Sequence, residues 1–375
     1  MASGKRVLIL YITESSGHHS AARAIKKAIE LREPESRVQC VNAFRYAFPF
    51  LERIIHTLYL IVIKRVPKIW EKMYDNPKLV GRTQIIKKWI HALAIRRIHT
   101  LIDHFKPDVV VCTQAFPCGI VAAYKKKNTR YSGIPLIGVL TDFAPHAFWV
   151  YDNVDYYVAH IPESRDMLIE KGVPQEKIKV FGIPIDPKFS LSQDRGELLA
   201  NYGLKEGIPV IMIMGGGRGL GPIKDLLYEL DLSKREFQVI VVCGMNKKLF
   251  DWIHHTRFKN RILAFRFTDQ IEHLMSMANL IITKPGGITT AEALAKKLRI
   301  IILNPIPGQE ARNTDFLTKR GAAIKIERPG EVLAAVDKML NLSVLQRGVV
   351  SILDNINPLS RPASSLEIAD FVLNL

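Results

Sequence analysis

The sequence predicts an α/β protein with the GT-B type of architecture, two Rossmann-like domains each built on a doubly wound parallel sheet. Its 375 residues exceed what one core usually fills, so two domains of ordinary size are expected. Short apolar runs that end in glycine, proline or polar turns alternate with longer helical patterns, which is typical of strand–helix–strand units. Hydrophobic residues make up 48% of the chain and its mean hydropathy is +0.07, which excludes a disordered chain and a multi-span membrane protein.

The apolar runs fall into two sets of predicted strands. The first set is Arg6 to Ile12, Val38 to Ala43, Asp108 to Cys112, Leu136 to Leu140, Tyr156 to Ala159 and Lys179 to Phe181. The second set is Val210 to Met214, Gln238 to Cys243, Ile262 to Phe267, Leu280 to Ile282 and Ile300 to Leu303. Each set predicts a parallel sheet with helices on both faces.

The domain linker is predicted over Gly182 to Lys188, because this stretch carries two prolines and a glycine after the last run of the first set. We therefore expect an N-terminal domain over residues 1–185 and a C-terminal domain over 186–360. Residues 361–375 include a short amphipathic helix that could cross back to the first domain.

Positive charge is concentrated in the first half of the chain. The net charge is +17, and residues 1–185 hold 28 Lys and Arg against 16 Asp and Glu. Twelve of the basic residues lie between Arg45 and Arg97, opposed by Glu52, Glu71 and Asp75 alone. The apolar run Ile54 to Ile63 is too short to cross a bilayer, which takes about 20 residues.

A helical apolar stripe follows this basic segment, formed by Ile90, Ala94, Ile98, Leu101, Ile102 and Phe105. Two explanations stay open. Residues 45–105 could form an interfacial surface that binds anionic lipid headgroups. Alternatively, the helices pack on their own domain and the basic residues form a solvated face.

The chain's compartment is predicted from its cysteines and its first residues. The four cysteines are scattered, as expected of buried thiols in a reducing compartment. Met1 is followed by no segment of signal-peptide type. We therefore expect a cytoplasmic protein and, if residues 45–105 bind lipid, a peripheral one on the cytoplasmic face of the cell membrane.

The turn from Lys284 to Glu292 joins an apolar strand to the opening of a helix through two glycines. Such a junction aims backbone N–H groups and the positive end of a helix dipole at one point, which suits a diphosphate. Glu292 lies about one helical turn further on, where its carboxylate could accept hydrogen bonds from ribose hydroxyls. The turn predicts a nucleotide site, and specifically a nucleotide-sugar site.

Two other strand-to-helix turns are candidates for the same ligand edge of the sheets. In Ser15 to Ser20, Gly17 permits a tight turn and His18 could take a proton from a hydroxyl, although a histidine there is often only a capping or surface residue. In Gly215 to Gly221, five glycines in seven positions indicate a phosphate or sugar site, or else a flexible surface turn. Arg218 could contact phosphate or point to solvent. Neither glycine-rich turn is a Walker A loop.

Five motifs in this order resemble one family over nearly the whole chain. They are the Gly-His pair after the first strand, Leu140 to His146 with Trp149, Gly215 to Gly221, Lys284 to Glu292, and Gly308 to Asn313. Together they resemble the monogalactosyldiacylglycerol synthase and processive diacylglycerol glucosyltransferase family and, more distantly, the peptidoglycan N-acetylglucosaminyl transferase. The resemblance implies a GT-B fold with a cleft between the domains, a UDP-sugar held by the C-terminal domain and a lipid acceptor at the N-terminal one.

The resemblance also implies roles for individual residues. On the donor side it assigns Glu292 to the ribose, Phe267 and Thr268 to the uracil ring, Gly286, Gly287 and Thr289 to the diphosphate turn, Gly216, Gly217 and Arg218 to the glycine loop, and Gln309, Glu310 and Asn313 to the donor sugar. Core packing is the alternative for Phe267. On the acceptor side it implies catalytic roles for His18, Asp142 and His146, with Gly17 and Trp149 nearby.

The sequence departs from the family pattern at two turns. The first turn reads Ser-Ser-Gly-His where relatives have more glycine, which affects the acceptor pocket. Arg218 stands where an acidic or small residue is common, which leaves open the transferred sugar and the way the diphosphate is neutralised.

An inverting reaction that needs no cofactor and no metal is expected. The chain contains no Asp-x-Asp pair to hold a cation on the diphosphate, so N–H groups, a helix dipole and Arg218 or Lys284 would stabilise the leaving UDP. His18 and Asp142 would act as a cooperating pair to remove the acceptor proton, in an order that the sequence does not rank. The expected product is a β-glycosyldiacylglycerol made from UDP-glucose or UDP-galactose.

Other classes of function remain as alternatives. The acceptor could be another lipid or a polyprenyl-linked molecule, and a UDP-sugar epimerase or hydrolase could use the same fold. Nucleic-acid binding would suit the net charge of +17, but the basic residues alternate with long apolar runs and form no recognised nucleic-acid motif. No nucleic-acid partner is expected.

Overall fold

The computed structural model describes residues 4–14, 16–48, 84–127, 131–144, 149–303, 305, 308–341 and 352–375, with the backbone alone at 84–94, 127 and 341. Contacts divide the chain into two compact units. The first unit comprises Met1–Pro187, Ile306–Gln309 and Ala363–Leu375, and the second comprises Lys188–Pro305 and Glu310–Pro362. The chain first passes between them at Pro187, inside the stretch from which a linker was predicted.

The first unit contains a six-stranded parallel sheet in the order β2-β1-β3-β4-β5-β6. Its strands are β1 (Arg6–Tyr11), β2 (Arg37–Asn42), β3 (Val109–Cys112), β4 (Leu136–Val139), β5 (Tyr156–Ala159) and β6 (Ile178–Val180). In register, Val7 lies beside Val38 on one side and Val109 on the other. The strand order therefore reverses between β1 and β3, and ligands of such sheets bind outside the carboxyl ends of the strands at this point.

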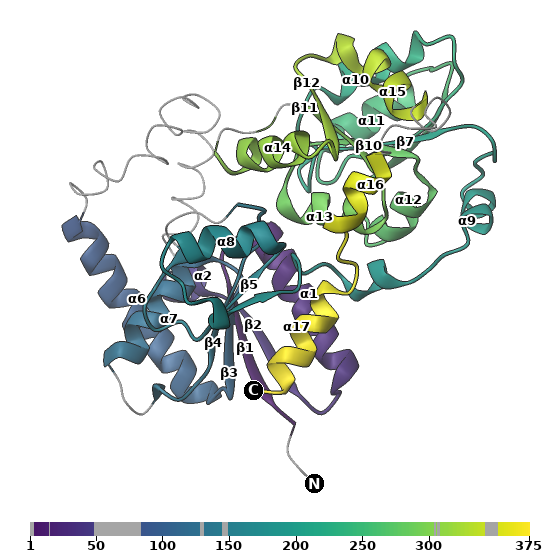
Figure 1. Ribbon diagram of the computed structural model, residues 1–375. Helices are drawn as coiled ribbons and strands as arrows, with labels where there is room; N and C mark the ends of the chain where they lie inside the picture. The colour runs from purple at the N-terminus through teal and green to yellow at the C-terminus, as the bar shows by residue number, and fades with distance from the viewer. Residues whose placement is uncertain are drawn as a thin grey trace. The chain divides into compact units, whose positions relative to one another are not determined.

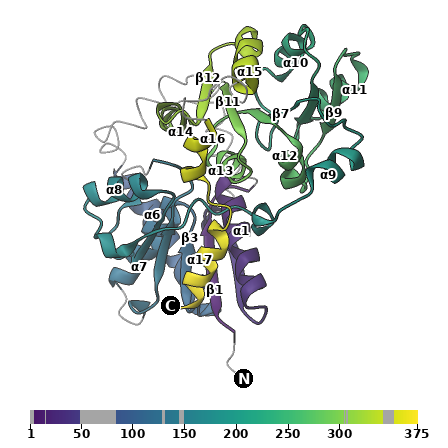
Figure 2. The ribbon, with the colours of Figure 1, turned by 45° about the vertical axis from the view of Figure 1, so that its right-hand side comes forward.

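Alternate residues of β1 enter two separate cores of the first unit. Val7 and Ile9 face α1 (Gly17–Arg32) and the C-terminal helix α17 (Ser364–Leu373), while Leu8 and Leu10 lie in the core with α2, α6, α7 and α8. Those helices span Ala43–Ala47, Gln84–Phe105, Ala115–Lys127 and Pro162–Glu170. Figures 1 and 2 both show α17 beside α1. Both faces of the sheet are covered, as a doubly wound parallel sheet requires.

The apolar stripe of α6 packs inside the first unit wherever the structure describes its side chains. Ile98, Leu101 and Ile102 are buried in the core, and the partly buried Phe105 packs against it. The interfacial-helix explanation is therefore wrong for these residues, because core contacts already cover them. Residues 49–83 of the basic segment, and the side chains of 84–94, lie outside the described residues.

No helix within the described residues has both the length and the apolar character needed to cross a membrane.

The second unit repeats this architecture with the strand order β12-β11-β10-β7-β8-β9. Its strands are β7 (Val210–Met214), β8 (Gln238–Val242), β9 (Arg261–Phe265), β10 (Leu280–Thr283), β11 (Arg299–Leu303) and β12 (Ala323–Ile326). Its α-helices are α9 (Arg195–Asn201), α10 (Ile223–Asp231), α11 (Lys247–His255), α12 (Ile271–Met277), α13 (Gly287–Ala295), α14 (Gln309–Lys319), α15 (Val332–Asn341) and α16 (Ile352–Ile356). The strand order reverses between β7 and β10, which are the strands that end at the two glycine-rich turns.

Short 3-10 helices connect several of these elements, at Gln175–Lys177, Pro187–Ser190, Pro329–Glu331 and Asn357–Leu359. Most predicted strands differ from the structure by at most one residue at an end, and two predictions differ by more. Edge strand β12 was not predicted, because Ala323–Ile326 is short and only half of it is buried. The strand predicted to end at Phe267 ends at Phe265, so Phe267 belongs to the following loop.

Candidate active site

His18 lies at the ligand edge of the first sheet, between the ends of three adjacent strands. It is the second residue of α1, whose N-cap residue Ser16 accepts a hydrogen bond from the His19 backbone N–H at 3.3 Å. The His18 Nδ1 atom lies 2.9 Å from the Thr113 carbonyl oxygen, which directly follows β3. It also lies 3.0 Å from the hydroxyl oxygen of Thr141, which follows the end of β4. In return, the Thr113 hydroxyl donates to the His18 carbonyl at 2.9 Å.

These contacts fix the tautomer of the His18 imidazole. A carbonyl oxygen can only accept, so we assign the ring proton to Nδ1, which donates to Thr113 and leaves the lone pair on Nε2. Burial lowers the pKa of His18 to about 4, although the bond to Thr113 acts in the opposite direction. The ring is therefore neutral at pH 7, with Nε2 able to accept a proton.

Asp142 follows Thr141 directly, so the structure brings its segment to His18. The next residue, Phe143, is buried, and its carbonyl accepts a hydrogen bond from the Ser164 hydroxyl at 2.6 Å. The ring of Phe143 also meets His160 edge-on, with the ring centroids 4.6 Å apart. This segment is thus anchored from α8 and from the end of β5.

Trp149 is 3% exposed and lies in the hydrophobic core, so its side chain supports the domain instead of lining an acceptor pocket. His146 lies outside the described residues. Gly17, also predicted on the acceptor side, is exposed at the opening of α1.

The glycine loop after β7 is held in place by hydrogen bonds. The Leu220 N–H donates to the Gly215 carbonyl at 2.9 Å, and the Met245 N–H donates to the Gly217 carbonyl at 3.0 Å. The Asn246 side chain donates to the Gly219 carbonyl at 3.0 Å. These bonds favour an ordered loop over a flexible surface turn. Gly216 is half-buried, and Gly217 and Arg218 are exposed.

The glycine loop and the second glycine turn lie side by side in the second unit. Strand β7 pairs with β10, and the Thr283 hydroxyl donates to the Met214 carbonyl at 2.8 Å, so the two strands end together. A small hollow beside these ends is lined by residues of both turns, among them Gly215, Gly221 and Lys284. The phosphate-binding candidates of the sequence therefore meet at one edge of the second sheet.

Helix α13 begins at Gly287, and its N-cap residue, Gly286, provides no side chain to accept from the first-turn N–H groups. A Cβ atom added at Gly286 would meet no atom within 4 Å, so the space directly beside the helix opening is clear. Thr289 and Glu292 are both half-buried on this helix. A clear approach, uncapped N–H groups and the positive end of the dipole together suit an anionic ligand.

Three further predicted donor residues lie on α14. The Glu310 carboxylate is 3.4 Å from the Lys284 ammonium, so these two candidates are paired with each other. Asn313 is fully buried and donates to the Pro285 carbonyl at 2.9 Å, so its side chain braces the glycine turn. Gln309, which contacts group with the first unit, donates to the Ala144 carbonyl at 3.4 Å.

Phe267 is 67% exposed, which excludes the alternative that its ring packs in the core. It lies in the short loop between β9 and α12 with Thr268, whose hydroxyl accepts from the Gln270 N–H at 3.1 Å. An exposed aromatic ring fixed on a short loop is suited to stack on a flat ligand.

Sequence reasoning missed the residues that position the predicted ones. Thr113 and Thr141 hold His18, while Asn246 holds the glycine loop. A polar residue directly after each buried strand was the only signal available for the two threonines. In the part of the chain that the structure describes, no group of three or more His, Cys, Asp or Glu could hold a metal ion. The expectation of a metal-independent reaction stays a prediction.

Comparison with known proteins gives two family matches. The model of the monogalactosyldiacylglycerol (MGDG) synthase family matches residues 18–185, and that of the glycosyltransferase family 28 C-terminal domain matches residues 210–344. Processive diacylglycerol beta-glucosyltransferase of Bacillus subtilis is 31% identical over 343 residues, covering 91% of this chain and 88% of the relative. The Bacillus cytotoxicus protein of that name is 30% identical over 383 residues, covering 100% and 94%.

Solved structures show the same fold at low sequence identity. MurG of Acinetobacter baumannii matches with a TM-score of 0.61 and 16% identity, covering 99% of this chain and 100% of that one. The calicheamicin glycosyltransferase CalG4 matches with a TM-score of 0.63 and 10% identity, covering 99% and 98%. UDP-GlcNAc 2-epimerase of Neisseria meningitidis matches with a TM-score of 0.58 and 15% identity, covering 99% and 100%.

The fold is GT-B, and the ligand edges of its two sheets carry the motifs of a glycosyltransferase. The chain belongs to the family of the monogalactosyldiacylglycerol synthases and processive diacylglycerol beta-glucosyltransferases, within glycosyltransferase family 28.

Proposed function

We propose that this glycosyltransferase moves a hexose from a UDP-sugar to diacylglycerol and forms a β-glycosyldiacylglycerol. The observation that carries the proposal is the fixed His18 ring, a neutral imidazole with its Nε2 lone pair kept available at the ligand edge of the first sheet. The names of the relatives favour diacylglycerol as the acceptor and glucose over galactose as the sugar.

On the donor side, the proposal assigns the UDP-sugar to the second unit. Phe267 would stack on uracil and Glu292 would accept from the ribose hydroxyls. The diphosphate would lie at Gly286 and Gly287, where the first-turn N–H groups of α13 would donate to it. Gly216, Gly217 and Thr289 would line the diphosphate, and Gln309 and Glu310 would contact the sugar. The Lys284–Glu310 pair makes Lys284 a partner of the sugar-binding carboxylate, so the exposed Arg218 becomes the better candidate to approach phosphate.

On the acceptor side, the hydroxyl oxygen of diacylglycerol would attack the anomeric carbon. The new carbon–oxygen bond forms as the bond from that carbon to the β-phosphate oxygen breaks, and UDP leaves with the electron pair. His18 Nε2 and the Asp142 carboxylate form the pair that receives the hydroxyl proton and orients the acceptor. Attack opposite to the leaving group inverts an α-linked donor to a β-linked product.

Access to diacylglycerol would require the protein to reach a membrane surface. The family relation and the basic excess between Arg45 and Arg97 support peripheral binding to anionic lipid on the cytoplasmic face. Flotation with vesicles of neutral or anionic lipid tests this point. Binding that depends on anionic lipid and weakens with salt is expected, and equal binding to neutral vesicles would contradict it.

The reaction is tested with the purified protein, diacylglycerol vesicles and separate UDP-sugars, with the lipid products identified by mass. A hexosyl-diacylglycerol formed from UDP-glucose, with one UDP released for each product, is the expected result. UDP release without acceptor would indicate hydrolysis, and interconversion of the UDP-sugar would indicate an epimerase. Either result in place of transfer would overturn the proposal.

A further inference from the structure

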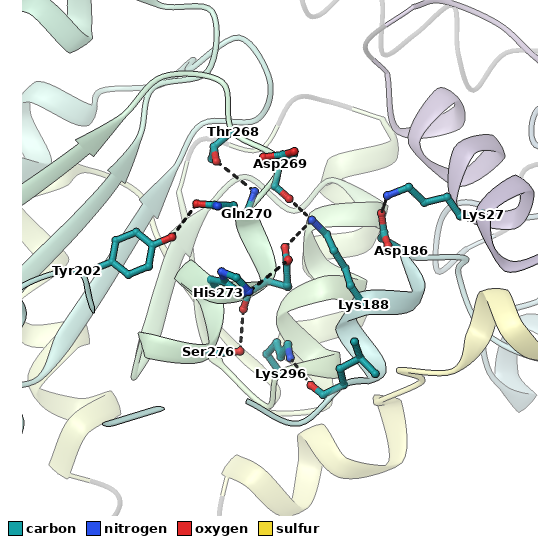
Figure 3. A network of polar contacts seen from close by, with 12 residues as sticks. Lys27, Asp186, Lys188, Tyr202, Thr268, Asp269, Gln270, His273, Ser276 and Lys296 are labelled. Carbon is teal, nitrogen blue, oxygen red and sulfur yellow. Dashed lines mark hydrogen bonds and ion pairs between the residues drawn. The ribbon is translucent and has the colours of Figure 1, made fainter. Parts of the chain in front are cut away.

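A buried carboxylate lies beneath the loop that carries Phe267. Glu272, in the first turn of α12, is 5% exposed, and its Oε2 is 2.6 Å from the ammonium of Lys188. Its other oxygen is 3.8 Å from His273 Nε2. Burial lowers the pKa of Lys296, and the Glu272 carboxylate opposes this shift, so a second lysine senses its charge. Figure 3 shows Lys188, His273 and Lys296 gathered there.

Lys188 connects this carboxylate to the Phe267 loop. Its ammonium also donates to the Asp269 backbone carbonyl, two residues after Phe267 (Figure 3). The loop has a second anchor at Gln270, whose side-chain oxygen accepts from the Tyr202 hydroxyl at 2.8 Å. The loop between β9 and α12 is only a few residues long, so these two anchors restrict the backbone on which the Phe267 ring is presented.

Stability alone does not explain this ion pair. Burying the Glu272 carboxylate beside the half-buried Lys188 side chain has a desolvation cost, and well-packed apolar residues of the same volume often stabilise a protein as much or more. The pair instead restricts the position of the loop, because the Lys188 ammonium binds both the Glu272 carboxylate on α12 and the backbone carbonyl of Asp269 in the loop. No such bridge would be needed if the Phe267 loop served only to connect two elements.

We propose that Lys188 is a positioning residue for nucleotide-base recognition, which it achieves by clamping the Phe267 loop through Asp269 and Glu272. This inference rests on the proposed function, because it takes the ring of Phe267 to be the platform for the base. Lys188 is the first residue of the second unit, so the segment that enters this unit sets the geometry of the base platform. Tyr202, at the C-terminal end of α9, holds the same loop through its hydrogen bond to Gln270.

The test compares uridine and UDP binding by calorimetry in the whole protein. Lys188→Met removes the ammonium and should weaken the binding of both uridine and UDP by about tenfold, because a small displacement of a binding group has effects of that order or larger. The KM for the UDP-sugar should rise by a similar factor with kcat retained, a split that a general loss of folded protein would not give. Lys188→Arg keeps the charge and the donors, and should retain most of the affinity.

Two further variants keep the inference falsifiable. Lys325→Met on β12 removes an exposed ion pair with Glu327, 2.8 Å long, and as the matched control it should bind uridine like the wild type. If Lys188→Met does not fold, Tyr202→Phe is used instead. It removes only the hydrogen bond to Gln270 and should still weaken uridine binding. Wild-type uridine affinity in folded Lys188→Met, or in Tyr202→Phe if Lys188→Met does not fold, would overturn the inference. A wild-type chain that binds neither uridine nor UDP would instead overturn the proposed function, and this inference with it.

Discussion

At the scale of single residues, the most informative feature is a histidine whose proton position is set by the backbone. The Thr113 carbonyl determines which nitrogen of His18 carries hydrogen, and burial keeps the ring uncharged. Both effects come from tertiary contacts, since Thr113 lies 95 residues from His18 in the chain. A base prepared in this way needs no change of tautomer before it accepts a proton from an alcohol.

We expect His18 to titrate with a pKa of about 4, well below the ordinary histidine value of 6.5. Between these two values the unfolded chain binds a proton that the folded chain does not, so His18 lowers stability as pH falls through this window. NMR titration of the ring, assigned by comparison with His18→Gln, measures the pKa. The same variant should lose part of the acid-side fall in stability, and a midpoint near 6.5 would contradict the burial that we infer.

Glu292→Ala should weaken binding of UDP by about tenfold or more, because hydrogen bonds to a charged group contribute roughly 1.5–3 kcal/mol each. Calorimetry with UDP measures the change without requiring turnover. Glu236→Ala, which removes an exposed carboxylate from the same unit, is the control and should bind UDP normally. Unchanged UDP affinity in Glu292→Ala would contradict the assignment of Glu292 to the ribose hydroxyls.

At the scale of elements, the glycine loop shows why some positions accept no other residue. Gly219 has a φ of +57°, and a Cβ atom there would lie 2.1 Å from the Cys243 carbonyl oxygen. The loop therefore packs directly on the backbone that follows β8, and Asn246 completes the contact while it also caps α11. Backbone against backbone leaves no flexible atom that could move aside.

Gly219→Ala should lower the melting temperature and weaken UDP binding together, because strain of about 1–3 kcal/mol must be relieved by moving the loop. The matched control is Gly133→Ala, where the added methyl group meets no atom within 4 Å and φ is not positive. That change should leave stability equal or higher, since it reduces the freedom of the unfolded chain. Differential scanning fluorimetry with and without UDP compares the two, and equal curves would contradict the assigned strain.

The elements that the sequence predicted are those whose burial leaves a pattern. Val210–Met214 is buried at every position, so its bounds could be predicted without error. Strand β12 was not predicted, because the sequence of an edge strand with one exposed side resembles that of a loop. The stripe of α6 was correctly recognised as apolar, but a periodic stripe does not say whether protein or lipid covers it, and for Ile98, Leu101 and Ile102 it is protein.

The candidate site was predictable to the same degree. Glycines and charged residues directly after buried strands located the turns, because parallel strands end at one edge of a sheet. The contacts that orient these residues were not predictable, since they join distant parts of the chain. Lys284 and Glu310 were expected to serve phosphate and sugar separately, and their ion pair appears only in the folded unit. Asn313 likewise fills a bracing position that no local pattern indicates.

At the scale of the whole molecule, the last helix of the chain completes the core of the first unit. Ile368 and Val372 of α17 are fully buried beside Ile25 and Ile29 of α1. Lys5 donates to the Leu373 carbonyl at 2.7 Å, and Phe371 packs edge-on against Tyr156 with ring centroids 5.1 Å apart. The first unit therefore cannot be complete until the C-terminal segment has been synthesised.

Because α17 packs in the first unit, a change in this helix should alter the stability of the first unit without altering the proposed UDP site of the second. Ile368→Ala removes buried atoms at a cost of about 2–5 kcal/mol, so the first unit should unfold at a lower denaturant concentration. UDP binding at the second unit should persist under conditions in which the first unit is still folded. Near-UV circular dichroism follows unfolding, and calorimetry measures UDP binding on the same sample.

The control for Ile368→Ala is Asp370→Asn on the same helix. It removes an exposed ion pair with Arg32, 2.9 Å long, and such pairs contribute only about 0–1 kcal/mol. A small shift for Asp370→Asn and a large one for Ile368→Ala would assign the effect to the buried face of α17. Equal shifts would mean that the helix is held at its surface, and loss of UDP binding in folded Ile368→Ala would mean that the donor site depends on the first unit as well.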